Sequence, residues 1–109
     1  MNFENLLKRI MDSDVNIRHS IVTDLEGSIL TTSHREAITN YLSQEETEAS
    51  LRRAAIAWKG RKELSPKIGK GLYAVAAFEK ITRITFPLGE ENLIFVSMGS
   101  DAVRMDLHE

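Results

Sequence analysis

The chain has 109 residues, the size of one domain, and its 42% hydrophobic and 28% charged residues are ordinary for a soluble globular protein. A net charge of −2 gives the whole chain no pull toward nucleic acid or anionic lipid, and no apolar run is long enough to insert into a membrane. The absence of cysteine excludes disulfides, thiolate metal sites and cysteine nucleophiles, and it suits a reducing cytoplasm, where we expect the protein.

The first predicted element is an amphipathic helix over residues 3–11. Apolar residues recur there at i, i+3, i+4, i+7 and i+8, which gathers them on one side of a helix: Phe3, Leu6, Leu7, Ile10 and Met11. Asn2 is positioned to cap the helix, and Asp12-Ser13-Asp14 ends it. Charged residues interrupt the apolar positions, so the segment lacks the core of a signal peptide.

A β-hairpin follows. Ile17, His19, Ile21 and Thr23 alternate with their neighbours, as in a strand with one better-buried face. A turn over residues 24–27, with Gly27 free to take a positive φ, leads into a second strand over residues 28–32. Ser33 to Glu36 then matches a capping box, which predicts a short helical turn before Leu42.

A second capping box, Ser43 to Glu46, predicts a long helix over residues 44–59 with Gly60 as its stop. One side of this helix should pack on the sheet through Thr47, Leu51, Ala54, Ala55 and Trp58. The opposite side is small and partly apolar and includes Ser50 and Gly60. It is either a subunit contact or harmless surface alanine. The residues of this side that form the candidate dimer interface are Ala49, Arg53, Ile56 and Ala57.

Three strands complete the pattern. Residues 72–78 are apolar on both sides, which predicts a central strand covered on both faces. Residues 81–88 carry Pro87, which must lie at a strand end or edge, and after a loop at 89–92 the strand 93–98 closes the sheet. A short helix over 102–107 is expected last. The predicted fold class is α+β, with a single five-stranded antiparallel sheet and helices on its faces.

Positive charge is concentrated in one segment. Seven of the chain's 14 basic residues lie between residues 52 and 70, beside one acid, Glu63. These cations either form an anion site, for phosphate, nucleic acid or an acidic partner, or complement the dipole at a helix C-terminus. The only aromatic residue within the segment, Trp58, points to the core side, so we do not expect a nucleic acid partner. The candidate anion patch is Arg52, Arg53, Lys59, Arg61, Lys62, Lys67 and Lys70.

No residue pattern indicates catalysis. Gly69-Lys70-Gly71 lacks the GxxxxGK[ST] pattern of a phosphate-binding loop and is interpreted as a flexible entry to the next strand. His19, His34 and His108 lack partners at metal-ligand spacing and are interpreted as strand or surface histidines. We therefore expect no enzymatic activity, no metal and no cofactor.

The order helix, hairpin, long helix and three strands, with IVTDLEGSIL over residues 21–30 as strand–turn–strand, resembles the roadblock (dynein light-chain) family, which is profilin-like in shape. Residues 54–59, 66–70, 78–80 and 85–89 are similar to small archaeal proteins of this shape. The resemblance covers roughly residues 3–100. It implies a single roadblock-like domain over residues 1–109 that forms dimers and acts as a scaffold or regulator of motors and small GTPases.

Three function hypotheses follow. The first is a non-catalytic interaction or regulatory module that acts as a homodimer, with another protein such as a small GTPase as a further partner. The second is anion or nucleic-acid binding through the basic segment of residues 52–70. The third is a small-molecule sensor of PAS type, which needs a cavity between the sheet and a helix.

Overall fold

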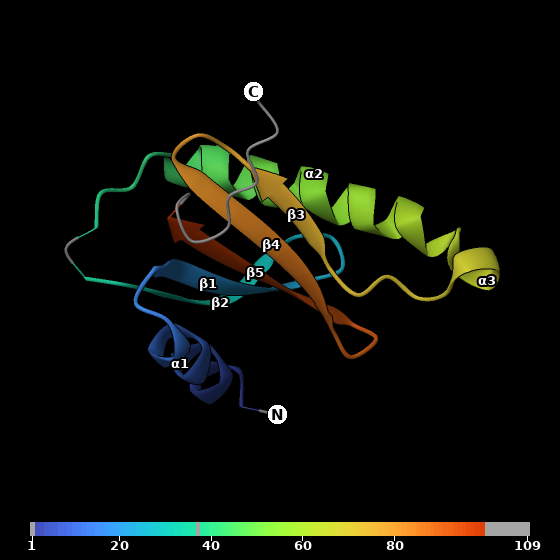
Figure 1. The fold of residues 1–109 in the computed structure, drawn as a ribbon, viewed down its shortest axis with the longest axis horizontal. Helices are drawn as coiled ribbons and strands as arrows, with labels where there is room; N and C mark the ends of the chain where they lie inside the picture. Colours follow the sequence, from blue (N-terminus) through green and yellow to red (C-terminus); the bar gives the residue numbers. More distant parts are fainter. Residues whose placement is uncertain (1, 37, 100–109) are drawn as a thin grey trace, which may run out of the picture.

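The computed structural model describes residues 2–36 and 38–99. Five strands form one antiparallel sheet in the order β2-β1-β5-β4-β3, which confirms the predicted fold class (Figure 1). The predicted helix over 102–107 lies outside the described residues. In chain order the elements are α1 (Phe3–Ser13), β1 (Ile17–Asp24), β2 (Ile29–His34), α2 (Gln44–Lys62), α3 (Ser65–Ile68), β3 (Ala74–Ala77), β4 (Ile81–Leu88) and β5 (Asn92–Gly99).

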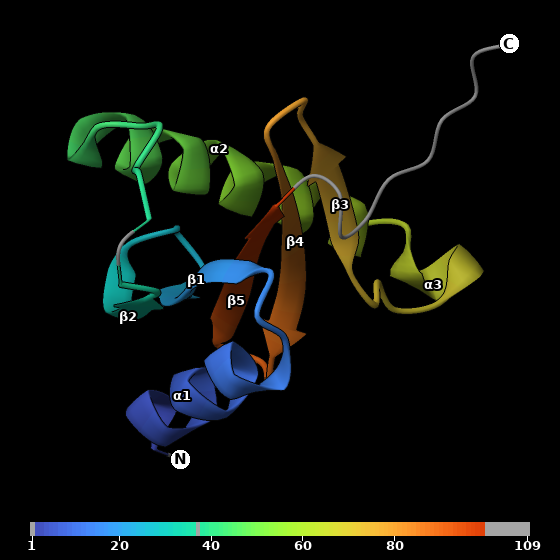
Figure 2. The same cartoon turned by 60° about the vertical axis from the view of Figure 1, so that its left-hand side comes forward.

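The sheet is covered on one face by α1 and on the other by α2 (Figures 1 and 2). The Asn2 side chain accepts a hydrogen bond from the Asn5 amide, as predicted, and the apolar side of α1 packs on a first core cluster. The α2 side of the sheet holds a second cluster built on Leu51, Ala55 and Trp58 of the helix. The expected packing side of α2 is thereby confirmed. No helix in the described ranges is long and apolar enough to cross a membrane.

Helix α2 begins where predicted but ends later. Both hydrogen bonds of the capping box are present between Ser43 and Glu46. The helix then continues past Gly60 to Lys62, so the prediction that Gly60 stops it is wrong. A glycine in a helix interior costs only about 1 kcal/mol relative to alanine, and the residues that follow, Arg61 and Lys62, are good helix formers. Their positive charge also complements the dipole of the last turn.

The prediction of a central strand over 72–78 is wrong. Strand β3 lies at the edge of the sheet, and β5 lies in the middle, with residues 93–98 all buried. Leu72 is 74% exposed and Phe78 is 62% exposed. An apolar run on both sides of a strand indicates that both sides can be covered, but it does not say whether the cover comes from the same chain.

The capping box predicted at Ser33 is also absent. Ser33 lies within β2, opposite Ser20 of β1, and the Arg35 amide continues the ladder by donating to the Arg18 carbonyl. Pairing with β1 therefore overrides the local helix signal. The predicted turn is confirmed, with Gly27 at φ 85°, in close contact with the backbone of α2 at Leu51 and Arg52.

Candidate interaction surface and pocket

The outer edge of β3 forms an exposed apolar surface. Strand β3 is the last in the sheet order, and within the described residues only β4 pairs with it. Side chains on both of its faces are exposed, and Tyr73 packs only partly, against Phe86 with ring centroids 6.1 Å apart. We call this the β3 edge surface; its large apolar members are Leu72, Tyr73, Val75 and Phe78.

Of the predicted dimer residues of α2, Ala57 is on the side of the helix nearest this surface. Ile56 is 70% exposed, and Arg53 and Ala57 are exposed, whereas Ala49 is half-buried. Ser50, expected on the same outward side, instead accepts a hydrogen bond from Nη1 of Arg83 on β4 at 2.6 Å. Because Ala57 lies two helical turns after Ser50, it is on the side of α2 that faces β4 and β3. Figures 1 and 2 both show β3 beside the second half of α2.

The seven cations of the candidate anion patch do not lie in one place in the structure. Arg52 and Arg53 are exposed on α2, and Lys67 is exposed on α3. Lys59 forms a salt bridge with Glu26 in the β1–β2 turn. The remaining three, Arg61, Lys62 and Lys70, line a pocket of about 340 Å³ beside Trp58. The Trp58 ring is only 4% exposed, as its predicted core position requires, so it offers no open face for a nucleic acid base.

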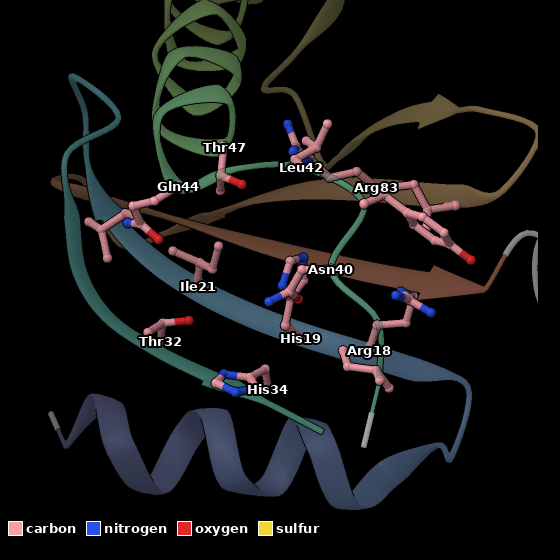
Figure 3. Close-up of a pocket in the computed structure, with 14 residues that line it drawn as sticks. Arg18, His19, Ile21, Thr32, His34, Asn40, Leu42, Gln44, Thr47 and Arg83 are labelled. Carbon is pink, nitrogen blue, oxygen red and sulfur yellow. The ribbon is translucent and has the colours of Figure 1, made fainter. Parts of the chain in front are cut away.

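A second pocket, of about 370 Å³, lies on the α2 side of the sheet (Figure 3). Its floor is formed by β1 and β2, and its walls by the start of α2 and the connection that carries Asn40 and Leu42. The lining residues are Arg18, His19, Ile21, Ile29, Thr32, His34, Ile38, Asn40, Tyr41, Leu42, Gln44, Thr47, Ile81 and Arg83.

Strand register brings the polar residues of this pocket together. His34 of β2 is opposite His19 of β1, which is opposite Ser97 of β5, which is opposite Arg83 of β4. These four residues form one row across the sheet. The register between β1 and β5 shifts by one residue between Ile17 and His19, so Arg18 is the extra residue of a β-bulge. A bulge re-aims side chains, and here both Arg18 and His19 line the pocket.

The electrostatics of the row are set by burial and by two guanidinium groups. Nε2 of His19 lies 2.7 Å from Oγ of Ser97. Burial, together with the positive charges of Arg83 and Arg18 and the neighbouring His34, lowers the pKa of His19 from 6.5 to about 4. Burial also lowers the pKa of Arg83, whose guanidinium carbon lies 5.9 Å from the Phe95 ring centroid. His19 is therefore neutral at pH 7, and the pocket's positive charge comes from the arginines.

The sequence pattern gives His19 and His34 no partners at metal-ligand spacing and does not single out Arg18 or Arg83. No group of three or more His, Asp or Glu side chains in the described ranges could hold a metal ion. A usable signal was present for two residues. His19 is two residues from Ile21, and Arg83 is two residues from Ile81, so strand alternation places both polar residues on the same face as an apolar neighbour. A polar side chain on a buried face costs free energy unless it is hydrogen-bonded, so such a position is a signal of function. The bulge at Arg18 has no such local signal.

No family model matches this chain, and no curated protein matches it in sequence. Solved structures do match it. The gliding protein MglB from Thermus thermophilus has a TM-score of 0.73 at 13% identity, covering 90% of this chain and 71% of that chain. A Roadblock/LC7 domain from Streptomyces avermitilis has a TM-score of 0.70 at 9% identity, covering 93% and 81%. An MglB structure with a tetrameric arrangement has a TM-score of 0.74 at 13% identity, covering 90% and 71%. This chain thus has the roadblock/LC7 fold, as its sequence resemblance implies.

Proposed function

We propose that this protein is a non-catalytic interaction module that forms a homodimer and regulates or scaffolds another protein. The observation that carries the proposal is the β3 edge surface, beside which exposed Ala57 of α2 lies, while Ile56 is exposed on the outer side of the same helix. The roadblock/LC7 fold supports self-association, since one MglB structure of this fold has a tetrameric arrangement.

An open strand edge has backbone N–H and C=O groups that a strand of a second molecule can pair with. Soluble proteins usually protect such edges with lysine, proline or a covering segment. The four residues of β3 are Ala-Val-Ala-Ala, without a charge or a proline. A second chain that added its own strand there would satisfy the backbone groups and cover Val75 and Phe78 together.

A homodimer with two-fold symmetry fits this surface better than an open chain of subunits. In a two-fold contact the same patch of both subunits is used, so β3 pairs with β3 and the exposed sides of the two α2 helices meet. Small residues at Ala49 and Ala57 let the helices approach closely, and Ile56 supplies apolar area that is stabilising once covered, at about 25 cal/mol per Å². The opposite edge, β2, is less suitable because its exposed residues are mainly polar.

The oligomeric state tests the proposal. We expect light scattering of the wild type at low micromolar concentration to give twice the mass of one chain. Ile56→Glu on α2 and Val75→Lys on β3 should each give the mass of a monomer. The matched control is Leu30→Glu, because Leu30 is 52% exposed on the other edge strand. A monomeric wild type, or dimers in both interface variants, would refute this surface.

For the protein partner, the resemblance implies a small GTPase as the first class to test by pull-down from the native host. The second candidate, nucleic-acid binding, rests on the grouping of Arg61, Lys62 and Lys70 around one pocket. Titration with nucleic acid at two salt concentrations separates the two. An affinity that falls steeply with salt, and is lost when Arg52, Arg53, Lys59 and Arg61 are changed to alanine, would favour the second candidate.

A further inference from the structure

The pocket of Figure 3 places polar side chains where a core would be expected. The neighbouring row across the sheet includes Ile21 and Phe95, which pack under α2 in the second core cluster. The row of His34, His19, Ser97 and Arg83 faces the same side but leaves an open volume instead of a packed layer. Burying polar groups costs free energy unless they are hydrogen-bonded. His19, Ser97 and Arg83 each have a hydrogen-bond partner within the protein, and the open volume beside them leaves room for the polar group of a ligand.

The charge of this pocket is of one sign. None of its fourteen lining residues is acidic. In the described ranges, neither Arg18 nor Arg83 has a carboxylate within salt-bridge distance, since the one salt bridge there is that of Lys59 with Glu26. Lys80 adds a third cation, with Nζ 5.1 Å from the centre of the Tyr41 ring. The pocket is therefore electropositive.

Both arginines keep donors free for a ligand. Arg83 uses Nη1 to donate to Ser50, and Arg18 uses Nη2 to donate to the Thr39 carbonyl while its guanidinium lies 4.8 Å from the Tyr41 ring centroid. A guanidinium has five N–H groups in a fork that matches a carboxylate or phosphate. These contacts hold each arginine in place, and within the described residues they use only one N–H group of each guanidinium, which is how a preorganised anion site is built.

We propose that this pocket binds a small organic anion, with its carboxylate or phosphate group held by Arg18 and Arg83 above His19. Ile21, Leu42 and Ile81 line the rest of the pocket and would contact an apolar or aromatic body of the ligand. The volume of about 370 Å³ is within the range of small-molecule sites. Nε2 of His19 is engaged by Oγ of Ser97, which holds the imidazole in place at the floor of the pocket.

This inference does not depend on the proposed dimer. The pocket is floored by β1 and β2, whereas the proposed subunit contact is at β3, on the far edge of the sheet. It is also distinct from the basic segment of residues 52–70, since no residue of that segment lines it. Oligomeric state and ligand binding can therefore be measured separately, and either proposal can fail alone.

The test is calorimetric titration of the full chain with two aromatic anions, phenyl phosphate and benzoate, and with phenol as the neutral analogue, in 150 mM sodium chloride. We expect saturable binding of at least one anion and none of phenol. Arg18→Gln and Arg83→Gln should each weaken it about tenfold or more, because each removes a charge-assisted hydrogen bond. Arg61→Gln, which changes a cation of the other pocket, should leave the affinity unchanged.

Other results would overturn the proposal. Absence of saturable binding of both anions at millimolar concentration would do so, as would binding that Arg61→Gln abolishes and Arg18→Gln does not. If Arg83→Gln fails to fold, Arg18→Gln decides alone, since Arg18 lies in a bulge and its side chain, within the described residues, contacts only the Thr39 carbonyl and the Tyr41 ring. A chemical-shift change at the His19 imidazole of the wild type locates the bound anion in this pocket, and a shift confined to other residues excludes it.

Discussion

Stability of the fold should fall as the pH is lowered, and His19 should be the main cause above the range in which carboxylates titrate. Burial next to Arg83 and Arg18 lowers the pKa of His19 from 6.5 to about 4. Between these two values the unfolded chain binds a proton at this imidazole and the folded chain does not. The unfolded state is therefore favoured as the pH falls, and the stability contributed by neutral His19 is complete only above pH 6.5.

The size of the effect follows from the two pKa values. Because folding and protonation of His19 are coupled, the free energy of unfolding should fall by about 2 kcal/mol between pH 7.5 and pH 5 from this one group. This loss is a large part of the free energy of unfolding of a typical protein, which is about 5–15 kcal/mol. Urea unfolding measures it directly through the fluorescence of Trp58, the single tryptophan of the chain, which is buried. The buffers must contain no phosphate or sulfate, since the proposed anion would stabilise the folded state.

The comparison variant is His19→Gln, which keeps a polar side chain opposite Ser97 and removes the titration. Its stability should change about 2 kcal/mol less than that of the wild type between pH 7.5 and pH 5. His34→Gln is the matched control, because it removes an exposed histidine of the same row and should leave the pH dependence of the wild type nearly intact. If wild type and His19→Gln gave parallel curves, the argument about His19 would be refuted.

The remaining predictions concern stability and are checked by urea unfolding. Arg35→Ala should cost about 2–3 kcal/mol, because the Arg35 guanidinium donates to the carbonyls of Met11, Asp14 and Ile17, whereas Arg9→Ala on the exposed side of α1 should change little. Gly27→Ala should cost roughly 3 kcal/mol or more, since its Cβ would lie 2.8 Å from the backbone of Leu51 and Arg52 at φ 85°. Gly89→Ala at φ 62°, with no neighbouring atom within 4 Å, should cost only about 1 kcal/mol. Gly60→Ala should stabilise by roughly 0.5–1 kcal/mol if α2 runs to Lys62, and a loss of stability would indicate that the helix ends at Gly60.

The features that the sequence predicts correctly are set by local chemistry. Asn2 and Ser43 cap helices because their side chains reach amides three residues later. Gly27 allows a backbone angle that the turn requires. The apolar stripe of α2 lies on the sheet because helical periodicity alone puts Leu51, Ala55 and Trp58 on one side.

The features that the sequence does not predict depend on which strands become neighbours. The two-sided apolar run of β3 is compatible with a central strand or with an edge that binds another molecule, and periodicity is the same in both. The residues at Ser33 match a capping box, but the segment pairs with β1 as a strand instead of starting a helix. The pocket requires the register of four strands and a bulge at Arg18, and none of these is encoded within a short stretch of sequence.

The most direct test of the account is residue-resolved amide hydrogen exchange of β3 at two protein concentrations. If the β3 edges of two chains pair, the amides of residues 74–77 that point away from β4 should exchange slowly at several hundred micromolar. They should lose this protection on dilution to the concentration where light scattering finds monomers, while the amides of the central strand β5 stay protected throughout. Rapid exchange of these β3 amides at both concentrations would contradict the proposed dimer.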